Sequence, residues 1–292
     1  MSKPAVNIMD NSMLTKNEIC SEDYETLRQF LQKNCGVVLG DNKHALVINR
    51  LQRLPGLFGV MSFKELVGQV TGAHNAQLRQ AVVDAMTTHE TFWFRDLYPF
   101  VYLKTLLQSL AATRRGKGEI RIWSAACSTG QEPYSIAIVV DELNQARALG
   151  DTRVRIVATD VATSVVEQAA EGVYPCLAIS RGMDAQRTKR YFDKTDQGDW
   201  AIKRKIKEYV TFSPLNLMES FDALGYFDIV LLRNVLIYFD HTLKADIISR
   251  VHRVFNQSGY LFLGASESIP QNQGLFVSEY YSPGIVYRNV MS

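Results

Sequence analysis

The stretch Arg121–Ser135, with the sequence RIWSAACSTGQEPYS, decides the fold of this chain. It begins with apolar residues typical of a buried strand, continues through small residues and turns at Gly130. Pro133, a residue favoured in the first turn of a helix, opens an apolar-periodic run that reaches Leu149. The pattern predicts a strand, a tight turn and a helix whose free N–H groups face a ligand.

The composition of this turn indicates which ligand it binds. The turn contains one glycine, whereas a dinucleotide pyrophosphate requires the several glycines of a GxGxxG turn. Glu132 stands where a phosphate would lie, and its carboxylate would repel one. The same carboxylate would attract S-adenosylmethionine, which carries an ammonium and a sulfonium group and no phosphate. The alternative is that Glu132 only complements the dipole of the helix.

Composition narrows the class of protein. The chain has 292 residues, of which 47% are hydrophobic, enough for a real core and two domains. A net charge of +2 gives no indication of a nucleic-acid partner, and none is expected. No apolar run is long enough to span a membrane, and the N-terminus does not resemble a signal peptide. Because the cysteines and histidines lack metal-ligand or disulfide spacing, we expect a soluble cytoplasmic protein without a metal.

The first part of the chain is predicted to be helical, because no strand pattern appears before residue 119. Residues 1–20 are predicted to be a flexible lead-in, and residues 21–112 a helical domain that includes the aromatic-rich segment 87–96. Pro55 and Gly56 are predicted to end the second helix. Apolar periodicity predicts one helix from Glu22 to before Gly36, then Lys43–Leu54, Ser62–Val70, Asn75–Met86 and Tyr98–Ala112.

Beyond a polar linker at residues 113–119, strands and helices alternate, so residues 120–292 are predicted to form a mostly parallel sheet with helices on both faces. Residues 276–290 are predicted to be two antiparallel strands, and residues 174–208 a small β-rich insertion. The predicted fold class is α/β, a Rossmann-like class I methyltransferase sheet with an N-terminal all-helical domain and a small inserted antiparallel β-subdomain. The remaining strands are predicted at Ile120–Ala125, Val154–Ala158, Tyr209–Phe212, Phe227–Leu232 and Tyr260–Leu263.

Candidate binding residues follow the predicted strands, at the edge of the sheet where doubly wound folds bind ligands. Asp160 ends the second strand and is predicted to hold ribose hydroxyls, although it could instead cap the next helix. Tyr238, just past the fourth strand, could line a substrate opening or simply pack. Asn216 and Leu217 follow the third strand, and Arg233, Asn234 and Val235 follow the fourth. The asparagines could contact the adenine or methionine part of the ligand, or only form turns.

Taken together, these motifs strongly resemble the CheR family, the S-adenosylmethionine-dependent glutamate methyltransferases of chemotaxis receptors. The resemblance covers about residues 20–290, and it is the joint pattern that is specific. It implies an N-terminal helical domain, a Rossmann-like methyltransferase domain and an inserted β-subdomain. The motifs are TTHETFWFRD (87–96), WSAACSTGQEPYS (123–135), ATD (158–160), NL (216–217), RNVLIYFD (233–240) and LFLGASES (261–268).

The resemblance also implies roles for single residues. Arg95, near the transferring methyl group, and Tyr238 are implied to be catalytic. His89 stands where the family often has asparagine, and Gln131 replaces the first acid of the family's usual Gly-Glu-Glu-Pro. The implied contacts to S-adenosylmethionine are His89, Thr91, Arg95, Glu132, Asp160, Asn216, Leu217, Asn234 and Val235.

The activity implied by the resemblance is transfer of a methyl group from S-adenosylmethionine to glutamate carboxylates of methyl-accepting chemotaxis proteins. The products are glutamate methyl esters, used in sensory adaptation, and S-adenosylhomocysteine. A monomeric cytoplasmic enzyme, recruited to membrane receptor arrays without inserting into the membrane, would meet the cytoplasmic helical region of the receptors. Three other interpretations are a methyltransferase for a small molecule or another protein, a non-catalytic adaptor that responds to S-adenosylmethionine, and an NAD-dependent oxidoreductase.

Basic residues on the predicted second helix are candidates for receptor docking. Lys43, Arg50 and Arg53 could meet a glutamate-rich receptor helix, although a solvated amphipathic helix would show the same pattern. Some family members also tether to a peptide at the receptor's C-terminus through the inserted β-subdomain. The turn at Lys194–Asp199 is short and holds a single glycine, Gly198, which favours an enzyme that needs no tether.

Overall fold

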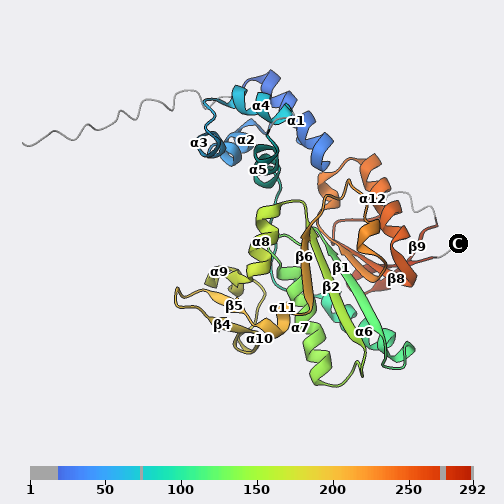
Figure 1. Ribbon diagram of the computed structural model, residues 1–292. Coiled ribbons are helices and arrows are strands. Elements are labelled where there is room, and N and C mark those ends of the chain that lie inside the picture. Colours follow the sequence, from blue (N-terminus) through green and yellow to red (C-terminus); the bar gives the residue numbers. More distant parts are fainter. Residues whose placement is uncertain (1–18, 73–74, 270–273, 291–292) are drawn as a thin grey trace, which may run out of the picture. The chain divides into compact units, whose positions relative to one another are not determined.

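The computed structural model describes residues 19–72, 75–269 and 274–290 (Figure 1). The predicted flexible lead-in, residues 1–20, therefore lies outside the described residues except for its last two. The described residues form two compact units, one of residues 19–33, 39–72 and 75–86, and the other of residues 34–38, 87–269 and 274–290.

The smaller unit is helical, as the sequence predicts. Its helix α5 packs against α2, α3 and α4. The core consists of apolar side chains that recur at helical spacing, such as Leu27 and Leu31 on α1, Val47 on α2 and Leu78 on α5, all fully buried. The helices are α1 (Ser21–Cys35), α2 (His44–Leu51), α3 (Leu54–Phe58), α4 (Phe63–Thr71) and α5 (Ala76–Met86).

The predicted helix Lys43–Leu54 is wrong at its end. It divides into α2, which ends at Leu51, and the short helix α3. Pro55 does not end a helix but lies in the first turn of α3, where its missing N–H loses no hydrogen bond. The helix ends instead at Gly59, whose φ of 68° is left-handed.

The larger unit is built on a seven-stranded sheet in the order β6-β2-β1-β7-β8-β10-β9. Strands β6, β2, β1, β7 and β8 are parallel neighbours, and β10 and β9 add antiparallel pairs at one side. The predicted α/β fold with a terminal hairpin is therefore confirmed. The strands are β1 (Glu119–Ala125), β2 (Arg153–Asp160), β6 (Val210–Pro214), β7 (Phe227–Leu232), β8 (Phe255–Leu263), β9 (Phe276–Tyr281) and β10 (Gly284–Asn289).

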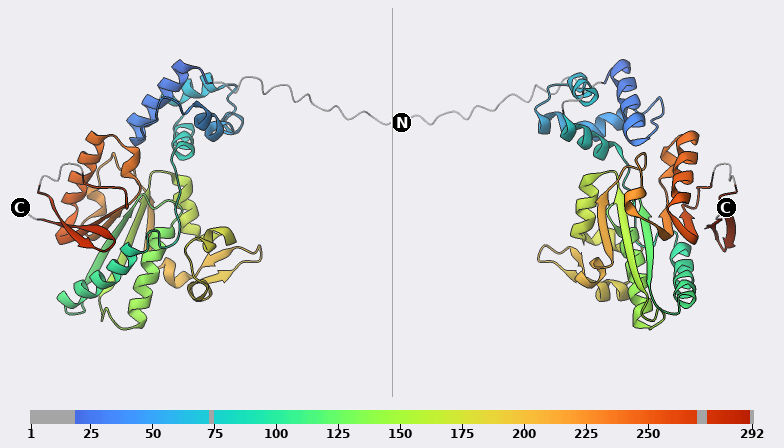
Figure 2. Two further views of the ribbon diagram at one scale, coloured as in Figure 1. Left: turned by 180° about the vertical axis from the view of Figure 1, so that it is seen from behind. Right: turned by 45° about the vertical axis from the view of Figure 1, so that its right-hand side comes forward.

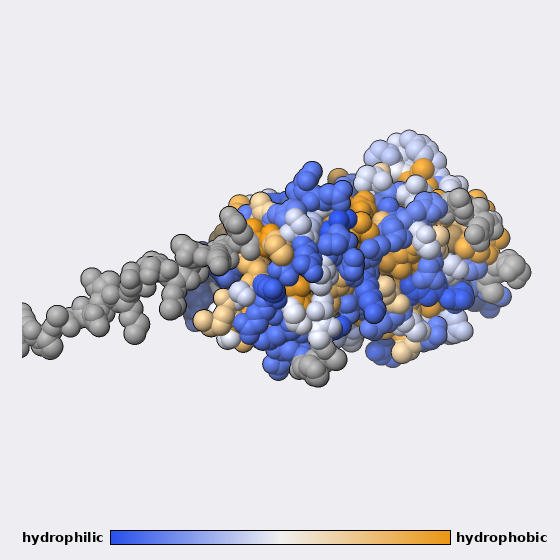
Figure 3. Space-filling model, turned by 90° about the horizontal axis from the view of Figure 1, so that it is seen from above, coloured by the Kyte–Doolittle hydropathy of each residue, from blue (hydrophilic) through white to orange (hydrophobic). Residues whose placement is uncertain are grey.

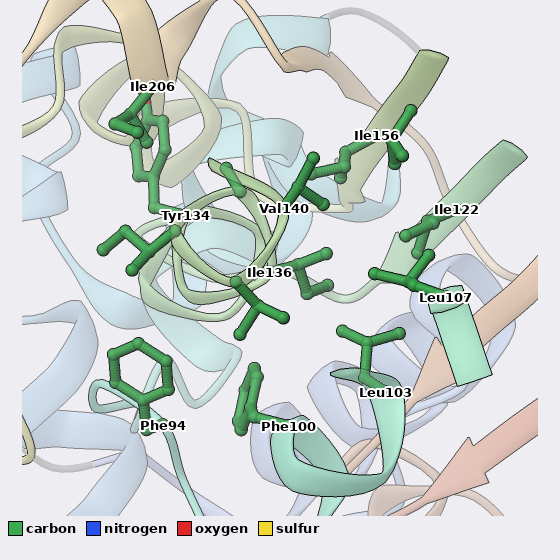
Figure 4. Close-up of a cluster of buried hydrophobic side chains, with 14 of the residues drawn as sticks. Phe94, Phe100, Leu103, Leu107, Ile122, Tyr134, Ile136, Val140, Ile156 and Ile206 are labelled. Carbon is green, nitrogen blue, oxygen red and sulfur yellow. The ribbon is translucent and has the colours of Figure 1, made fainter. Parts of the chain in front are cut away.

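Helices cover both faces of this sheet. One core cluster joins alternate strand residues such as Ile122 to α6 and α7, and another joins residues such as Trp123 to α12. Figure 4 shows Leu107 of α6 and Ile122 of β1 pointing toward one another, with Leu103 of α6 and Ile136 of α7 in the same cluster. The helices are α6 (Tyr98–Thr113), α7 (Gln131–Gln145), α8 (Thr163–Glu171) and α12 (His241–Arg253).

This packing changes where the boundary between the units falls. The sequence interpretation placed residues 87–112 in the helical domain, but the structure places them in the larger unit. The reason is that the apolar face of α6, including the buried Leu103 and Leu107, belongs to the core cluster that covers the sheet. The aromatic-rich segment 87–96 therefore lies in the same unit as the strands that carry the other candidate residues.

The predicted β-rich insertion is present between α8 and β6. Its three short strands form a separate antiparallel sheet in the order β3-β5-β4, which Figure 2 shows apart from the seven-stranded sheet. The predicted turn closes where the Thr195 N–H donates to the Asp199 carbonyl over 2.8 Å. The elements are β3 (Val173–Tyr174), α9 (Cys176–Ser180), α10 (Ala185–Tyr191), β4 (Phe192–Lys194), β5 (Trp200–Ile202) and α11 (Arg204–Lys207).

The surface of the protein carries both hydrophilic and apolar side chains. Figure 3 shows hydrophilic side chains over much of one face, with apolar side chains in groups between them. Within residues 19–72, 75–269 and 274–290, no helix combines the length and the apolar composition needed to cross a membrane.

A buried carboxylate ties α6 to the sheet. Asp228, in β7, is 4% exposed and accepts hydrogen bonds from the Arg121 N–H over 2.8 Å and from Asn256 Nδ2 over 3.0 Å. It also pairs with the guanidinium of Arg114, which directly follows α6. Because a buried carboxylate is stable only when its oxygens are fully partnered, this cluster specifies how α6 meets the sheet.

We expect Asp228→Asn to lower the free energy of unfolding by about 2 kcal/mol, because an amide cannot accept the same donors and leaves Arg114 without its counter-charge. Urea unfolding followed by circular dichroism measures the loss. The exposed residue Asp222 offers a control, and Asp222→Asn should change stability by less than about 0.5 kcal/mol. Equal stabilities of the two variants would contradict the proposed role of Asp228.

Candidate functional site

The loop between β1 and α7 follows an unusual backbone path. Ala126, Ser128 and Gly130 all have left-handed φ values, of 59°, 51° and 92°. A Cβ atom on Gly130 would lie 2.9 Å from Cβ of Ala169 and 3.0 Å from the Tyr174 hydroxyl. Glycine is therefore required at this position, both for its φ and for the space. Such strain persists only where the surroundings hold it, and it is typical of ligand-binding loops.

Asp160 holds this loop against β2. Its side chain is buried, and its Oδ2 accepts a hydrogen bond from the Ser128 N–H over 2.8 Å. Its Oδ1 accepts one from the Ala162 N–H over 3.1 Å, before the start of α8. The Ser128 hydroxyl in turn donates to the carbonyl of His89 over 2.9 Å. The carboxylate thus joins β2, the loop and the segment 87–96.

Glu132, in the first turn of α7, belongs to a buried cluster of charges. One of its carboxylate oxygens accepts from the Ser124 hydroxyl over 2.8 Å, and the other from Arg233 Nη1 over 2.7 Å. The Arg233 side chain is 1% exposed, and its Nη2 donates to the Asp96 carboxylate over 2.7 Å. Two carboxylates around one guanidinium leave a net charge of −1. This charge fits the ammonium and sulfonium groups of S-adenosylmethionine and would repel a phosphate.

Segment 87–96 belongs to the larger unit, and its residues Arg95 and Asp96 bond to Arg233 of the charge cluster. The Phe94 N–H donates to the Ser135 hydroxyl of α7 over 3.1 Å. The half-buried Arg95 guanidinium donates to the Glu90 carbonyl over 2.9 Å and lies 5.4 Å from the centre of the Phe92 ring. The Arg95 side chain is thus held within its own segment, while its backbone faces the charge cluster.

Two further predicted contacts precede Arg95 in this segment. The ring of His89 lies with Nε2 3.0 Å from the Thr87 hydroxyl oxygen, and its carbonyl accepts a hydrogen bond from Ser128 in the loop after β1. Thr91 is half-buried. The structure therefore joins four of the predicted contacts in two sets of hydrogen bonds, one linking Asp160 to the His89 carbonyl through Ser128 and the other linking Glu132 to the Arg95 carbonyl through Arg233. Segment 87–96 contributes a backbone carbonyl to each set.

The turn after β7 is held by one carboxylate that sequence analysis did not identify as a site residue. Asn234 has a left-handed φ of 59°, and its N–H donates to Glu267 over 2.7 Å. Glu267 also accepts from the N–H groups of Gly264 and Ile237, over 2.8 Å and 3.3 Å. The sequence signal was the motif LFLGASES, in which Glu267 is the acid. It fixes the turn that leads from Asn234 and Val235 to Tyr238.

The other residues predicted to follow strands make contacts within the protein. Asn216 donates from its amide to the Asn34 carbonyl over 2.6 Å and accepts from the Met218 N–H over 3.0 Å, which is turn chemistry. Leu217 is buried in the core cluster of α12, and Val235 and Tyr238 pack against the same cluster. Contact of these residues with a cofactor remains a prediction.

Cys127 lies buried in the loop after β1. Burial, followed by the nearby carboxylates of Asp160 and Glu132, raises the pKa of its thiol well above the usual range, so it stays protonated at neutral pH. In the part of the chain that the structure describes, no group of three or more His, Cys, Asp or Glu residues could hold a metal ion.

The three candidate docking residues differ from one another. Lys43 and Arg53 are exposed, at the starts of α2 and α3. Arg50 is half-buried, and its guanidinium donates to the Met86 carbonyl at the end of α5 over 2.6 Å. The prediction that Arg50 and Arg53 lie on one helix is wrong, because α2 ends at Leu51. Arg50 thus has a role inside the smaller unit.

Comparison with known proteins gives a family for both parts of the chain. Residues 89–283 match the S-adenosylmethionine-binding domain of CheR methyltransferases, and residues 22–87 match the all-alpha domain of CheR methyltransferases. Chemotaxis protein methyltransferase 1 of Pseudomonas aeruginosa is 46% identical over 268 residues, which cover 91% of this chain and 97% of that protein. The chemotaxis protein methyltransferase of Vibrio anguillarum is 43% identical over 276 residues, covering 94% of this chain and 99% of that protein.

We expect Asp160→Ala to weaken binding of S-adenosylhomocysteine by about 1–3 kcal/mol, which is about 5- to 150-fold, because the ligand and the loop lose charge-assisted hydrogen bonds. Isothermal titration calorimetry measures the affinity, and thermal unfolding checks that the variant is folded. Asp193, whose side chain is 71% exposed in β4, offers a control, since Asp193→Ala should bind like the wild type. An Asp160→Ala protein that binds as tightly as the wild type would rule out this role.

Proposed function

The chain belongs to the CheR family of S-adenosylmethionine-dependent chemotaxis methyltransferases, and we propose that it methylates glutamate side chains of chemotaxis receptors. The methyl esters formed would serve sensory adaptation. The observation that carries the proposal is the position of Arg95, whose backbone carbonyl shares the buried guanidinium of Arg233 with Glu132. The backbone that carries this cation, which can orient an acceptor carboxylate, is thus fixed to the same buried guanidinium as Glu132, a predicted cofactor contact.

Methyl transfer to a glutamate carboxylate requires few catalytic groups from the protein. S-adenosylmethionine, when bound, supplies an electrophilic methyl group. A glutamate side chain has an ordinary pKa of about 4.3, so it is already ionised at neutral pH and needs no general base. The opposite charges of carboxylate and sulfonium are neutralised in the transition state, so a site that excludes water favours transfer. The protein's task is to align and desolvate the reactants.

Arg95 and Tyr238 are the residues proposed to align the acceptor. The Arg95 guanidinium keeps donors beyond its bond to the Glu90 carbonyl, and these can orient a carboxylate. Tyr238 follows the turn fixed by Glu267 and is half-buried, which leaves it able to contact a substrate. A very tight bond from Arg95 would stabilise the ionised acceptor more than the transition state, so the contact is expected to be loose.

The proposed partner is the cytoplasmic helical, glutamate-rich region of the receptors. Lys43 and Arg53 expose two positive charges on the smaller unit, which suits an acidic helix. The turn at residues 194–199 carries one glycine and is short, so we propose docking without a peptide tether. The enzyme would act as a cytoplasmic monomer recruited to receptor arrays.

We expect Arg95→Ala to lower methyl transfer on the order of 100-fold while the protein remains folded, because the acceptor loses its orienting cation. Transfer of a tritiated methyl group to receptor-containing membranes measures the rate, and mass spectrometry of receptor peptides locates methyl esters on glutamates. If the wild type leaves receptor glutamates unmodified, the proposed function is wrong.

Arg181 provides a matched control for this experiment. Its guanidinium also lies 5.4 Å from the centre of the Phe92 ring, and it pairs with the Glu90 carboxylate. Arg181→Ala therefore removes a similar cation from the same ring and should keep turnover within about threefold of the wild type. Equal losses in both variants would mean that Arg95 acts only through its segment.

For docking, we expect the double variant Lys43→Glu/Arg53→Glu to raise the apparent KM for receptor about fivefold or more at low salt, and much less at high salt, because exposed charges are screened. The double variant Lys104→Glu/Arg147→Glu makes the same change in net charge at exposed residues of the larger unit. If both double variants raise KM equally, net charge rather than a docking face is responsible.

A further inference from the structure

We propose that Arg233 is a positioning residue that fixes the backbone of Arg95 relative to Glu132, so that one buried guanidinium sets the methyl acceptor against the cofactor. The proposal rests on the proposed function for the role of Arg95. It assigns Arg233 no contact with substrate, and it makes Asp96 the second residue through which Arg233 acts.

The contacts of Arg233 join three elements that are far apart in the sequence. From the end of β7, its Nη1 donates to Glu132 at the start of α7 over 2.7 Å. Its Nη2 donates to the Arg95 carbonyl over 2.9 Å and to the Asp96 carboxylate over 2.7 Å. A planar guanidinium presents its donors in a fixed fork, so these bonds define directions as well as distances.

The turn that carries Arg95 needs such support. Phe94, Asp96 and Leu97 have left-handed φ values of 52°, 68° and 51°, which are uncommon for residues other than glycine. Strained conformations of this kind persist only where neighbouring groups hold them. Arg95 lies inside this turn, and its carbonyl is one of the groups that Arg233 binds. The direction of the Arg95 side chain therefore depends on the bonds that Arg233 makes.

Burial of Arg233 is costly, which argues for a specific role. Its Nε has no hydrogen-bond partner among the described residues, and its side chain is 1% exposed. A buried ion pair is often no more stabilising than apolar residues of similar volume, so stability alone is weak grounds for it. What an apolar residue could not do is hold the Arg95 carbonyl and two carboxylates in one geometry.

Asp96→Asn tests this role without disturbing the core. The Asp96 side chain is 29% exposed, and asparagine tolerates a left-handed φ, so the variant removes charge from one side of Arg233 and adds no strain. We expect kcat for methyl transfer to fall about tenfold. The dissociation constant for S-adenosylhomocysteine should rise by a smaller factor, about threefold, because the cluster loses one negative charge but the bond from Arg233 to Glu132 remains.

Arg233→Lys removes the guanidinium that bonds to Glu132 on one side and to the Arg95 carbonyl and Asp96 on the other. A lysine ammonium is a single point charge and cannot hold all three acceptors in their present geometry. We therefore expect this variant to lose kcat and to bind S-adenosylhomocysteine about tenfold more weakly. Asp151→Asn, an exposed aspartate that precedes β2, is the control and should match the wild type in both measurements.

Hydrogen exchange followed by mass spectrometry gives a readout that does not depend on the methyl acceptor. In Asp96→Asn and Arg233→Lys, backbone amides of residues 94–98 should exchange about tenfold faster, while those of β1 keep their protection. Unchanged exchange in residues 94–98 overturns the inference whatever the substrate is. Faster exchange with an unchanged kcat overturns it too, because the turn would then be only structural.

Failure of the inference and failure of the proposed function give different results. A wild-type protein that methylates receptor glutamates, with an Asp96→Asn variant of equal kcat, counts against Arg233 alone. A wild-type protein that does not methylate receptors counts against the proposed function, and hydrogen exchange then decides whether Arg233 holds the turn.

Discussion

The hydrogen bonds of the Asp160 carboxylate are the interaction on which the binding edge of the sheet depends. They fix the strained loop after β1 to the end of β2, and through the Ser128 hydroxyl they also fix the His89 carbonyl. Without them, the left-handed residues Ala126 and Ser128 would relax, and the N-terminus of α7 would lose its place. The same group that is predicted to hold a ribose thus builds the surface that the ribose meets.

The sequence was sufficient for most of the fold, for physical reasons that particular elements show. The run Phe227–Leu232 is apolar except for Asp228 because β7 is buried on both faces, so the sequence predicts this strand with its observed bounds. The prediction that Pro55 ends a helix is wrong because proline is common both just after one helix and in the first turn of the next, where it lies here. The domain that α6 belongs to depends on long-range packing of Leu103 and Leu107, which periodicity alone does not reveal.

The residues of the candidate site also differ in whether the sequence around them indicates their role. Glu132 and Asp160 could be found because each stands at a fixed place in a strand-turn-helix unit, where a ligand contact has a local signal. The sequence places Arg233 after a strand but does not indicate its partners, because Glu132 and Asp96 are more than 100 residues away in the sequence. Glu267 was noticed only as part of a motif, and nothing in local spacing indicates that it binds three backbone N–H groups.

The charge cluster also explains why an arginine can lie beside a site for a cation. If Glu132 and Asp96 faced the site alone, two carboxylates would repel each other and would bind an inorganic cation as readily as an organic one. Arg233 separates them and leaves a net charge of −1. S-adenosylmethionine, with an ammonium, a carboxylate and a sulfonium, has a net charge of +1, so the two sets of charges are complementary. Transfer of the methyl group removes the sulfonium charge, which weakens this attraction and favours release of the product.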